Sequence, residues 1–175
     1  MTRYQFEEQV LRLIGKNDPQ FKVDGREILA LANQSALSYL KELKRNGLEI
    51  PTSFYVPYTK TIVKGFATIP LAVIGKDAIE SVIKSDEIIP IVSNEAEARI
   101  FDVIGHEPSC WVVEGGVKFR NVLDGEATIK AIPNLLEIED EDLMYGDDVQ
   151  YEIINRIFAM LQIKLETKED RENNG

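Results

Sequence analysis

The sequence predicts an α+β fold, and three observations support this class. Apolar residues recur with a helical period in the first 46 residues, with a period of two in the middle, and with a helical period again after residue 148. Helices and strands therefore come in blocks, without the alternation of a parallel sheet. The 175 residues, 44% of them hydrophobic, suit one ordinary domain. We expect a single α+β domain over residues 1–165, with an N-terminal helix pair, a small antiparallel β-sheet and a C-terminal helix.

The first helix is predicted to begin after Thr2, whose hydroxyl suits an N-cap. It is expected to end near Ile14, because Gly15 follows as a stop. The apolar positions recur mostly three and four residues apart and are Phe6, Val10, Leu11, Leu13 and Ile14. This segment is predicted to be a short amphipathic helix.

A longer helix is predicted from Asp24 to Asn46. Asp24 and Glu27 lie three residues apart and form a variant of the capping box. Lys44 and Arg45 suit the C-terminal end, where the helix dipole favours cations. The apolar stripe consists of Ile28, Leu29, Leu31, Ala32, Ala36, Leu40 and Leu43.

Aromatic and β-branched residues then predict strands within Ser53–Val63 and around Phe66–Ile74. Pro57 and Pro70 interrupt these runs, which favours edge strands because proline cannot donate to a ladder. Two interpretations stay open for residues 51–75. The segment is either an extended arm that packs on another chain or a pair of ordinary edge strands.

The next region combines a short apolar run with a helical turn. Ile88–Val92 is apolar and contains a proline. Asn94–Ile100 carries Glu95, Glu97 and Arg99 and is predicted to form the helical turn.

The clearest hairpin signal is CWVVEGGVKFRNV. Gly115 and Gly116 separate two apolar runs, as in a two-residue primed turn that needs positive φ at both positions. Strands are predicted over Cys110–Glu114 and Val117–Val122.

A third strand is predicted to extend this hairpin into an antiparallel meander. Asp124 and Gly125 make the next turn, Ala127–Ile132 forms the strand, and Pro133 ends it. The whole sheet is expected to have about five short strands.

The segment from Glu137 to Asp148 is strongly acidic and precedes the last predicted helix. It lacks the D-x-D-x-D-G loop of a calcium site, so a solvated acidic loop is favoured. The helix carries its apolar side at Val149, Ile153, Ile154, Ile157, Phe158, Leu161 and Leu165. Residues 166–175 are expected to be a polar, frayed tail.

Composition excludes several function classes. Thirty acidic and 20 basic residues give a net charge of −10, which disfavours binding to duplex DNA or to an anionic membrane. One cysteine and one histidine cannot build a disulfide or a His/Cys zinc cage. The N-terminal acids and the absence of a long apolar run predict a soluble protein of a reducing compartment.

No residue is predicted to be catalytic, cofactor-binding or metal-binding, and the chain is not expected to be an enzyme. His106 and Cys110 are interpreted as a loop histidine and a buried strand cysteine, because Pro108 breaks the stretch between them. The glycines match neither a Rossmann fingerprint nor a phosphate-binding loop. Trp111 is interpreted as structural.

The order of parts resembles the head-to-tail connector subunits of tailed bacteriophages and is most similar to ring proteins of crAss-like podoviruses. The resemblance covers nearly the whole chain. It is carried by RNGLEIP, FYVPYTKTIV, FATIPLAVIG, WVVEGGVKF, EATIKAIPN and EDLMYGDDVQYEIINRIF.

This resemblance implies a virion structural protein without cofactors, made in the bacterial host cytoplasm. It implies a homo-oligomeric ring of twelve copies beneath the portal that extends the DNA channel. The implied partners are the portal protein and neighbouring tail or ring proteins, with no membrane. Acidic residues on the channel wall would repel phosphates, so that DNA passes without specific binding. The alternative is a small acidic cytosolic adaptor or regulatory module that binds a basic protein.

Overall fold

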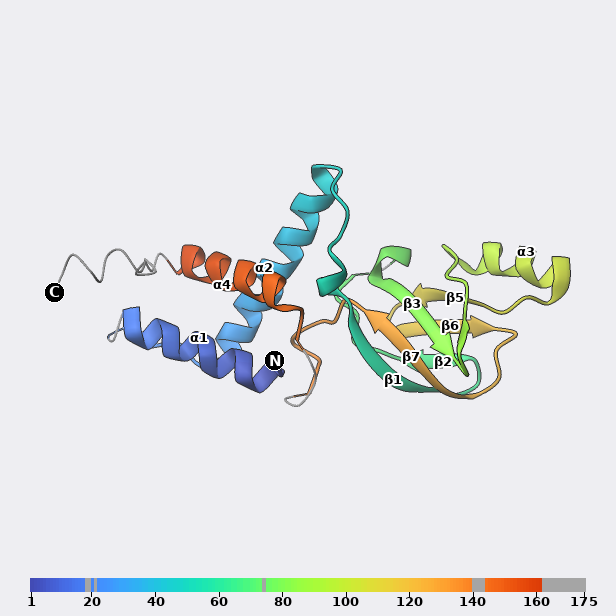
Figure 1. Cartoon of the computed structure of the whole chain (residues 1–175), viewed down its shortest axis with the longest axis horizontal. Coiled ribbons are helices and arrows are strands. Elements are labelled where there is room, and N and C mark those ends of the chain that lie inside the picture. Colours follow the sequence, from blue (N-terminus) through green and yellow to red (C-terminus); the bar gives the residue numbers. More distant parts are fainter. Residues whose placement is uncertain (18–19, 21, 74, 140–143, 162–175) are drawn as a thin grey trace. The chain divides into compact units, whose positions relative to one another are not determined.

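The computed structural model describes residues 1–17, 20, 22–73, 75–139 and 144–161. It confirms the α+β class, with four α-helices and seven strands among these residues (Figure 1). The chain divides into two compact units, residues 1–50 with 139–175 and residues 51–138. The expected single domain over residues 1–165 did not include this division. The middle of the chain has enough apolar side chains to bury a core of its own. The predicted tail lies outside the described residues.

The helical unit contains α1 (Arg3–Asn17), α2 (Gly25–Arg45) and α4 (Asp147–Met160). Its core is formed by most of the apolar side chains of the predicted stripes, with two further contributors before α4, Met144 and Tyr145. The half-buried members of these stripes are Leu11, Leu13, Leu31 and Leu161. Residues 140–143 of the acidic segment and Leu165 of the predicted helix lie outside the described residues. The buried apolar residues of the helices are Phe6, Val10, Ile14, Ile28, Leu29, Ala32, Ala36, Leu40, Leu43, Val149, Ile153, Ile154, Ile157 and Phe158.

Both predicted N-caps are confirmed by hydrogen bonds. The backbone N–H of Glu27 donates to Asp24 Oδ1 at 2.8 Å. The N–H of Gln5 donates to Thr2 Oγ1 at 3.3 Å, and Gln5 Oε1 accepts from the Thr2 N–H at 3.0 Å, which completes a reciprocal capping box. The predicted stop at Gly15 is wrong, because an exposed glycine lowers helix stability by only about 1 kcal/mol and α1 continues past it.

Arg156 of α4 ties α4 to α2. Its Nη2 donates to Glu42 Oε2 at 2.7 Å and its Nε donates to Glu152 Oε1 at 2.6 Å. The guanidinium carbon lies 4.8 Å from the centroid of the Tyr39 ring. This side chain therefore combines a charged fork with aromatic stacking, an arrangement particular to arginine.

Arg156→Ala is expected to lower the free energy of unfolding by about 1–2 kcal/mol, because the stacking and the charge-assisted hydrogen bonds are lost together. Arg156→Lys should recover only part of this loss, since lysine lacks the planar fork. Urea denaturation followed by circular dichroism measures both changes. Lys41→Ala on the exposed face of α2 is the control, and an equal loss there would contradict the assignment.

The β-rich unit contains two sheets where the sequence predicted one. The first sheet has the order β1-β7-β3-β4 and the second β2-β6-β5, all paired antiparallel. Strand β3 lies where no strand was predicted. Strand β4 overlaps the start of the segment in which only an apolar run was noted. The bounds are β1 (Val56–Ile62), β2 (Phe66–Thr68), β3 (Ile79–Lys84), β4 (Glu87–Ile88), β5 (Ser109–Val113), β6 (Gly116–Arg120) and β7 (Gly125–Ala131), with 3-10 turns η1 (Thr52–Phe54) and η2 (Lys76–Ala78).

The predicted meander is wrong, because β7 does not pair with β6. It lies instead between β1 and β3, where its alternate side chains Ala127, Ile129 and Ala131 are buried. As a central strand, β7 buries more apolar surface than it would bury at the edge of the other sheet beside β6. The topology therefore depends on long-range burial, which the local pattern does not contain.

The prediction of edge strands in the proline-containing region is confirmed. β1, which contains Pro57, and β2 each lie at the edge of their sheet. The described residues of the segment 51–75 belong to the two sheets and their connections, as expected for the second interpretation, a pair of ordinary edge strands. Phe54, Val56, Tyr58 and Ile62 are buried within this segment.

The hairpin over β5 and β6 exists, but its turn differs from the prediction. Val113 pairs with Gly116, so Glu114 and Gly115 form the turn. Only Gly115 has positive φ, at 79°. Gly116 is a strand residue, and a Cβ built on it would lie 2.2 Å from the carbonyl oxygen of Ala67 in β2. The second glycine thus permits close approach of two strands.

Primed turns occur at two places without a double-glycine signal. Lys64 and Gly65 both have positive φ between β1 and β2, and their N–H groups donate to the Asp124 carboxylate at 2.9 and 3.3 Å. Ser85 and Asp86 have positive φ between β3 and β4. Both turns match the right-handed twist of the strands that they join.

Helix α3 (Glu95–Gly105) is longer than the predicted helical turn. Asn94 caps its first turn by accepting from the Glu97 N–H at 3.1 Å. His106 ends the helix with left-handed backbone, at φ 52°. The inner face of α3 contributes to a cluster with Trp111, whose members are Val92, Ala98, Phe101, Trp111 and Val113.

Candidate functional site

The interpretation of His106 and Cys110 is confirmed. Cys110 is fully buried in β5, and burial raises the pKa of its thiol to about 12. His106 is at the C-terminal cap of α3, and 85% of its side chain is exposed. A thiol held in its neutral form is a poor nucleophile. The position of Cys110 is therefore that of a structural thiol.

Asp102 in α3 is the centre of a polar cluster in the β-rich unit. Its Oδ2 accepts from Arg120 Nη2 at 2.6 Å and from Arg120 Nε at 3.0 Å. Its Oδ1 accepts from Asn121 Nδ2 at 2.8 Å and lies 2.9 Å from His106 Nδ1. Hydrogen bonds from Asn121, His106 and Arg120, in that order, hold the pKa of Asp102 well below its ordinary value. The cluster fixes the last turns of α3 to the end of β6.

Asp102→Asn is expected to destabilise the protein at neutral pH and much less in acid. A lowered pKa in the folded state means that the stabilisation is complete above the ordinary pKa and is lost as pH falls toward the lowered value. Urea midpoints measured between about pH 5 and about pH 2 should therefore converge for the wild type and the variant. Asp86→Asn, in an exposed turn, controls for removal of one carboxylate. Parallel curves for the wild type and Asp102→Asn would contradict this role.

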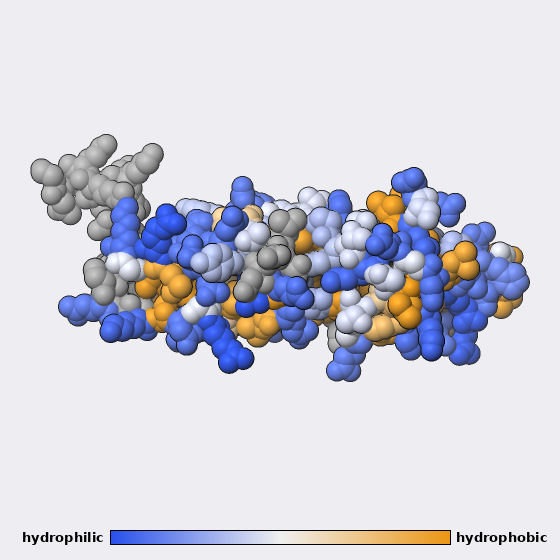
Figure 2. All heavy atoms as spheres, turned by 90° about the horizontal axis from the view of Figure 1, so that it is seen from below, coloured by the Kyte–Doolittle hydropathy of each residue, from blue (hydrophilic) through white to orange (hydrophobic). Residues whose placement is uncertain are grey.

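The outer face of α3 carries a stripe of large exposed aliphatic side chains. Ile100, Val103 and Ile104 are 57%, 87% and 77% exposed. Their spacing of three and four residues places them on one side of the helix, away from Ala98 and Phe101. We call these three residues the α3 stripe. Figure 2 shows hydrophobic side chains among hydrophilic ones on the right of the view, the side on which Figure 1 draws α3.

The sequence pattern predicted only a helical turn at this position, so the stripe was not expected. The signal was present in ARIFDVIG, where apolar residues occupy both sides of a continued helix. A helix that is apolar on two sides needs a second partner in addition to its own core. Surface positions this exposed are normally polar when a helix faces only water.

A cavity of about 360 Å³ lies in the same unit, beside the segments that follow β3 and β6. Leu123 at its edge is 84% exposed, and the neighbouring Ile88 is 74% exposed. We call it the Leu123 cavity. Its lining mixes apolar walls with one basic and one acidic side chain and consists of Lys84, Ser85, Glu87, Ile89, Pro108, Asn121, Val122 and Leu123.

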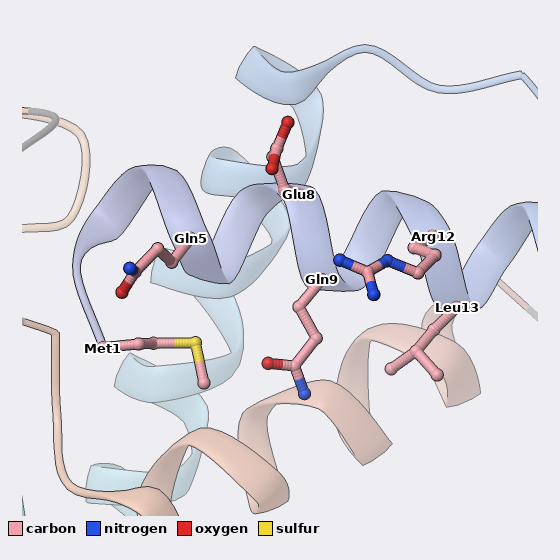
Figure 3. A pocket seen from close by; sticks show the side chains of 6 residues that line it. All are labelled: Met1, Gln5, Glu8, Gln9, Arg12 and Leu13. Atoms are coloured by element: carbon pink, nitrogen blue, oxygen red, sulfur yellow. The ribbon is translucent and has the colours of Figure 1, made fainter.

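A depression of about 520 Å³ lies along α1 in the helical unit (Figure 3). Five of the six side chains that line it come from α1 and the sixth is Met1, two residues before the helix, so no second helix or strand forms an opposite wall. In Figure 3, Gln9 and Leu13 point away from Glu8. Such an open surface on one helix suits contact with a macromolecule better than enclosure of a small ligand.

Neither a metal site nor a membrane-spanning helix is found in the described part of the chain. No group of three or more His, Cys, Asp or Glu side chains there is placed to hold a metal ion. No helix there is both long and apolar enough to span a bilayer. No protein-family model and no curated protein matches the chain.

Proposed function

We propose that this chain is a structural ring subunit of the head-to-tail connector of a tailed bacteriophage, assembled beneath the portal. The observation that carries the proposal is the α3 stripe, with side chains up to 87% exposed on a helix that is otherwise well anchored. Exposed apolar patches bordered by polar residues mark surfaces that another protein covers. The resemblance of the sequence to connector subunits supplies the class of assembly.

The character of the surfaces supports a structural role. The described cavities are open, and the one thiol is buried in a strand with a raised pKa. These features favour contact between macromolecules over reaction with a bound substrate. The proposal therefore assigns the stripe to assembly.

The net charge of −10 per chain supports the second part of the proposal, passage of DNA without binding. A ring of such subunits would present many carboxylates, and those on the channel wall would repel the phosphate backbone. If the acidic residues lay on the outer rim instead, the channel wall would not repel DNA, but the ring could still form. The resemblance implies a ring of twelve copies.

Quantitative peptide mass spectrometry on gradient-purified virions tests this function. We expect the chain in the particles at about one or two copies per portal subunit. Its absence from particles together with abundance in the soluble lysate would contradict the proposal. That result would favour the acidic adaptor, which should bind a basic protein one to one and lose affinity steeply with added salt.

A further inference from the structure

We infer that the α3 stripe of one copy docks into the Leu123 cavity of the next copy. This inference rests on the proposed function and names the partner of the stripe, a second copy of this chain. The stripe protrudes from a helix, whereas the cavity is concave and has apolar walls at Ile89 and Leu123. Both surfaces lie in the β-rich unit, so every subunit carries one of each.

Charge favours the cavity over a second stripe as the partner. The segment 95–107 carries four carboxylates and one arginine. Two such helices placed face to face would bring like net charges together, which is unfavourable. The Leu123 cavity carries Lys84, whose Nζ reaches the backbone oxygen of Asp124 at 3.5 Å, balanced by Glu87. Lys84 thus offers a cation to the net negative helix α3, whose Arg99 is already paired with Glu95 at 2.8 Å.

The stripe is held ready for docking. Asp102 fixes the last turns of α3 through Arg120 and Asn121, and Asn94 caps its first turn. Asn121 also lines the Leu123 cavity. The Asp102 cluster thus positions both surfaces, which lowers the ordering entropy that association must overcome.

A stripe-to-cavity contact is heterologous, because two different surfaces meet. Heterologous contacts repeat around an axis and form a ring when the rotation closes. A stripe-to-stripe contact would be isologous and would end at two copies. The inferred contact therefore provides the kind of interface that a ring requires.

Two single substitutions distinguish a stripe-to-cavity contact from a stripe-to-stripe contact. Val103→Asp destroys the stripe and leaves the cavity intact, whereas Leu123→Asp destroys the cavity and leaves the stripe intact. Both side chains are more than four-fifths exposed, so neither substitution removes a core contact. A carboxylate buried in an apolar contact should raise the dissociation constant by more than about 100-fold. Leu48→Asp, at another exposed leucine, is the control.

Sedimentation velocity and native mass spectrometry of the full chain measure how many copies each variant assembles. We expect large assemblies for the wild type and for Leu48→Asp, and monomers for each of the two site variants alone. An equal mixture of Val103→Asp and Leu123→Asp should form heterodimers and nothing larger, because only one intact stripe and one intact cavity can meet. Unchanged self-association of Leu123→Asp would overturn the inference in favour of a stripe-to-stripe dimer. A wild-type chain that stays monomeric, with no heterodimer in the mixture, would also overturn it. Presence of the chain in virions is measured separately, so that failure of the contact and failure of the proposed function are distinguishable.

Discussion

Gly116→Ala is expected to lower the free energy of unfolding of the β-rich unit by about 3 kcal/mol or more. The new Cβ would lie 2.2 Å from the Ala67 carbonyl oxygen and 2.9 Å from the Phe66 ring. Ala67 pairs with Val117 in the next position of the ladder, so relief of the overlap must separate β2 from β6. The closest atom is a backbone carbonyl oxygen, which cannot move aside as the end of a flexible side chain could.

Gly115→Ala is the matched control for this prediction. Gly115 has positive φ but nothing within 4 Å of its Cβ position, so alanine there should cost only about 1–2 kcal/mol of backbone strain. Trp111 is the one tryptophan of the chain and packs in this unit, so its fluorescence reports urea denaturation. Equal losses at the two glycines would contradict the account of Gly116 as a close-approach residue.

Phe158→Ala is expected to lower the free energy of unfolding of the helical unit by about 3–5 kcal/mol. Phe158 in α4 is 1% exposed and is among the largest fully buried side chains. Removal of the ring leaves a cavity that three helices cannot fully collapse. Circular dichroism at the helical minimum follows the change, and Trp111 fluorescence should shift less because it reports the other unit.

Tyr151→Ala is the control on the same helix. Tyr151 is 67% exposed, so its removal should change stability by no more than about 0.5 kcal/mol. A large loss at Tyr151, or a negligible loss at Phe158, would show that the α4 face assigned to the core is wrong.

The helical part of the fold was predictable because its signals are local. Thr2 and Asp24 cap their helices through backbone groups three residues away, and the stripe of α2 repeats every three or four positions. Pro57 also predicted its edge strand correctly, since a missing donor restricts a strand wherever it lies. These features depend on neighbours in the sequence.

The β-rich unit was less predictable because its pairing depends on distant residues. β7 crosses to the other sheet, and β3 pairs with it through Val82 and Ile129. Gly116 carries the same sequence signal as a turn glycine, and only the approach of Ala67 reveals its other role. Lys64 adopts positive φ, and its residue type does not predict this conformation.

The candidate site was not predicted because the expected helical turn was too short. A turn that ended at Ile100 contained neither Val103 nor Ile104. The stripe became visible only with the length of α3 and the exposure of its outer face. In a chain without a recognisable catalytic motif, exposed apolar side chains that its own core does not need are a useful indication of a functional surface.

Cryo-electron microscopy of the virion neck would show whether this chain forms a ring through the α3 stripe. We expect a ring beneath the portal into which the β-rich unit fits, with α3 of each subunit against the Leu123 cavity of its neighbour. A neck in which no ring accommodates this chain would contradict the account.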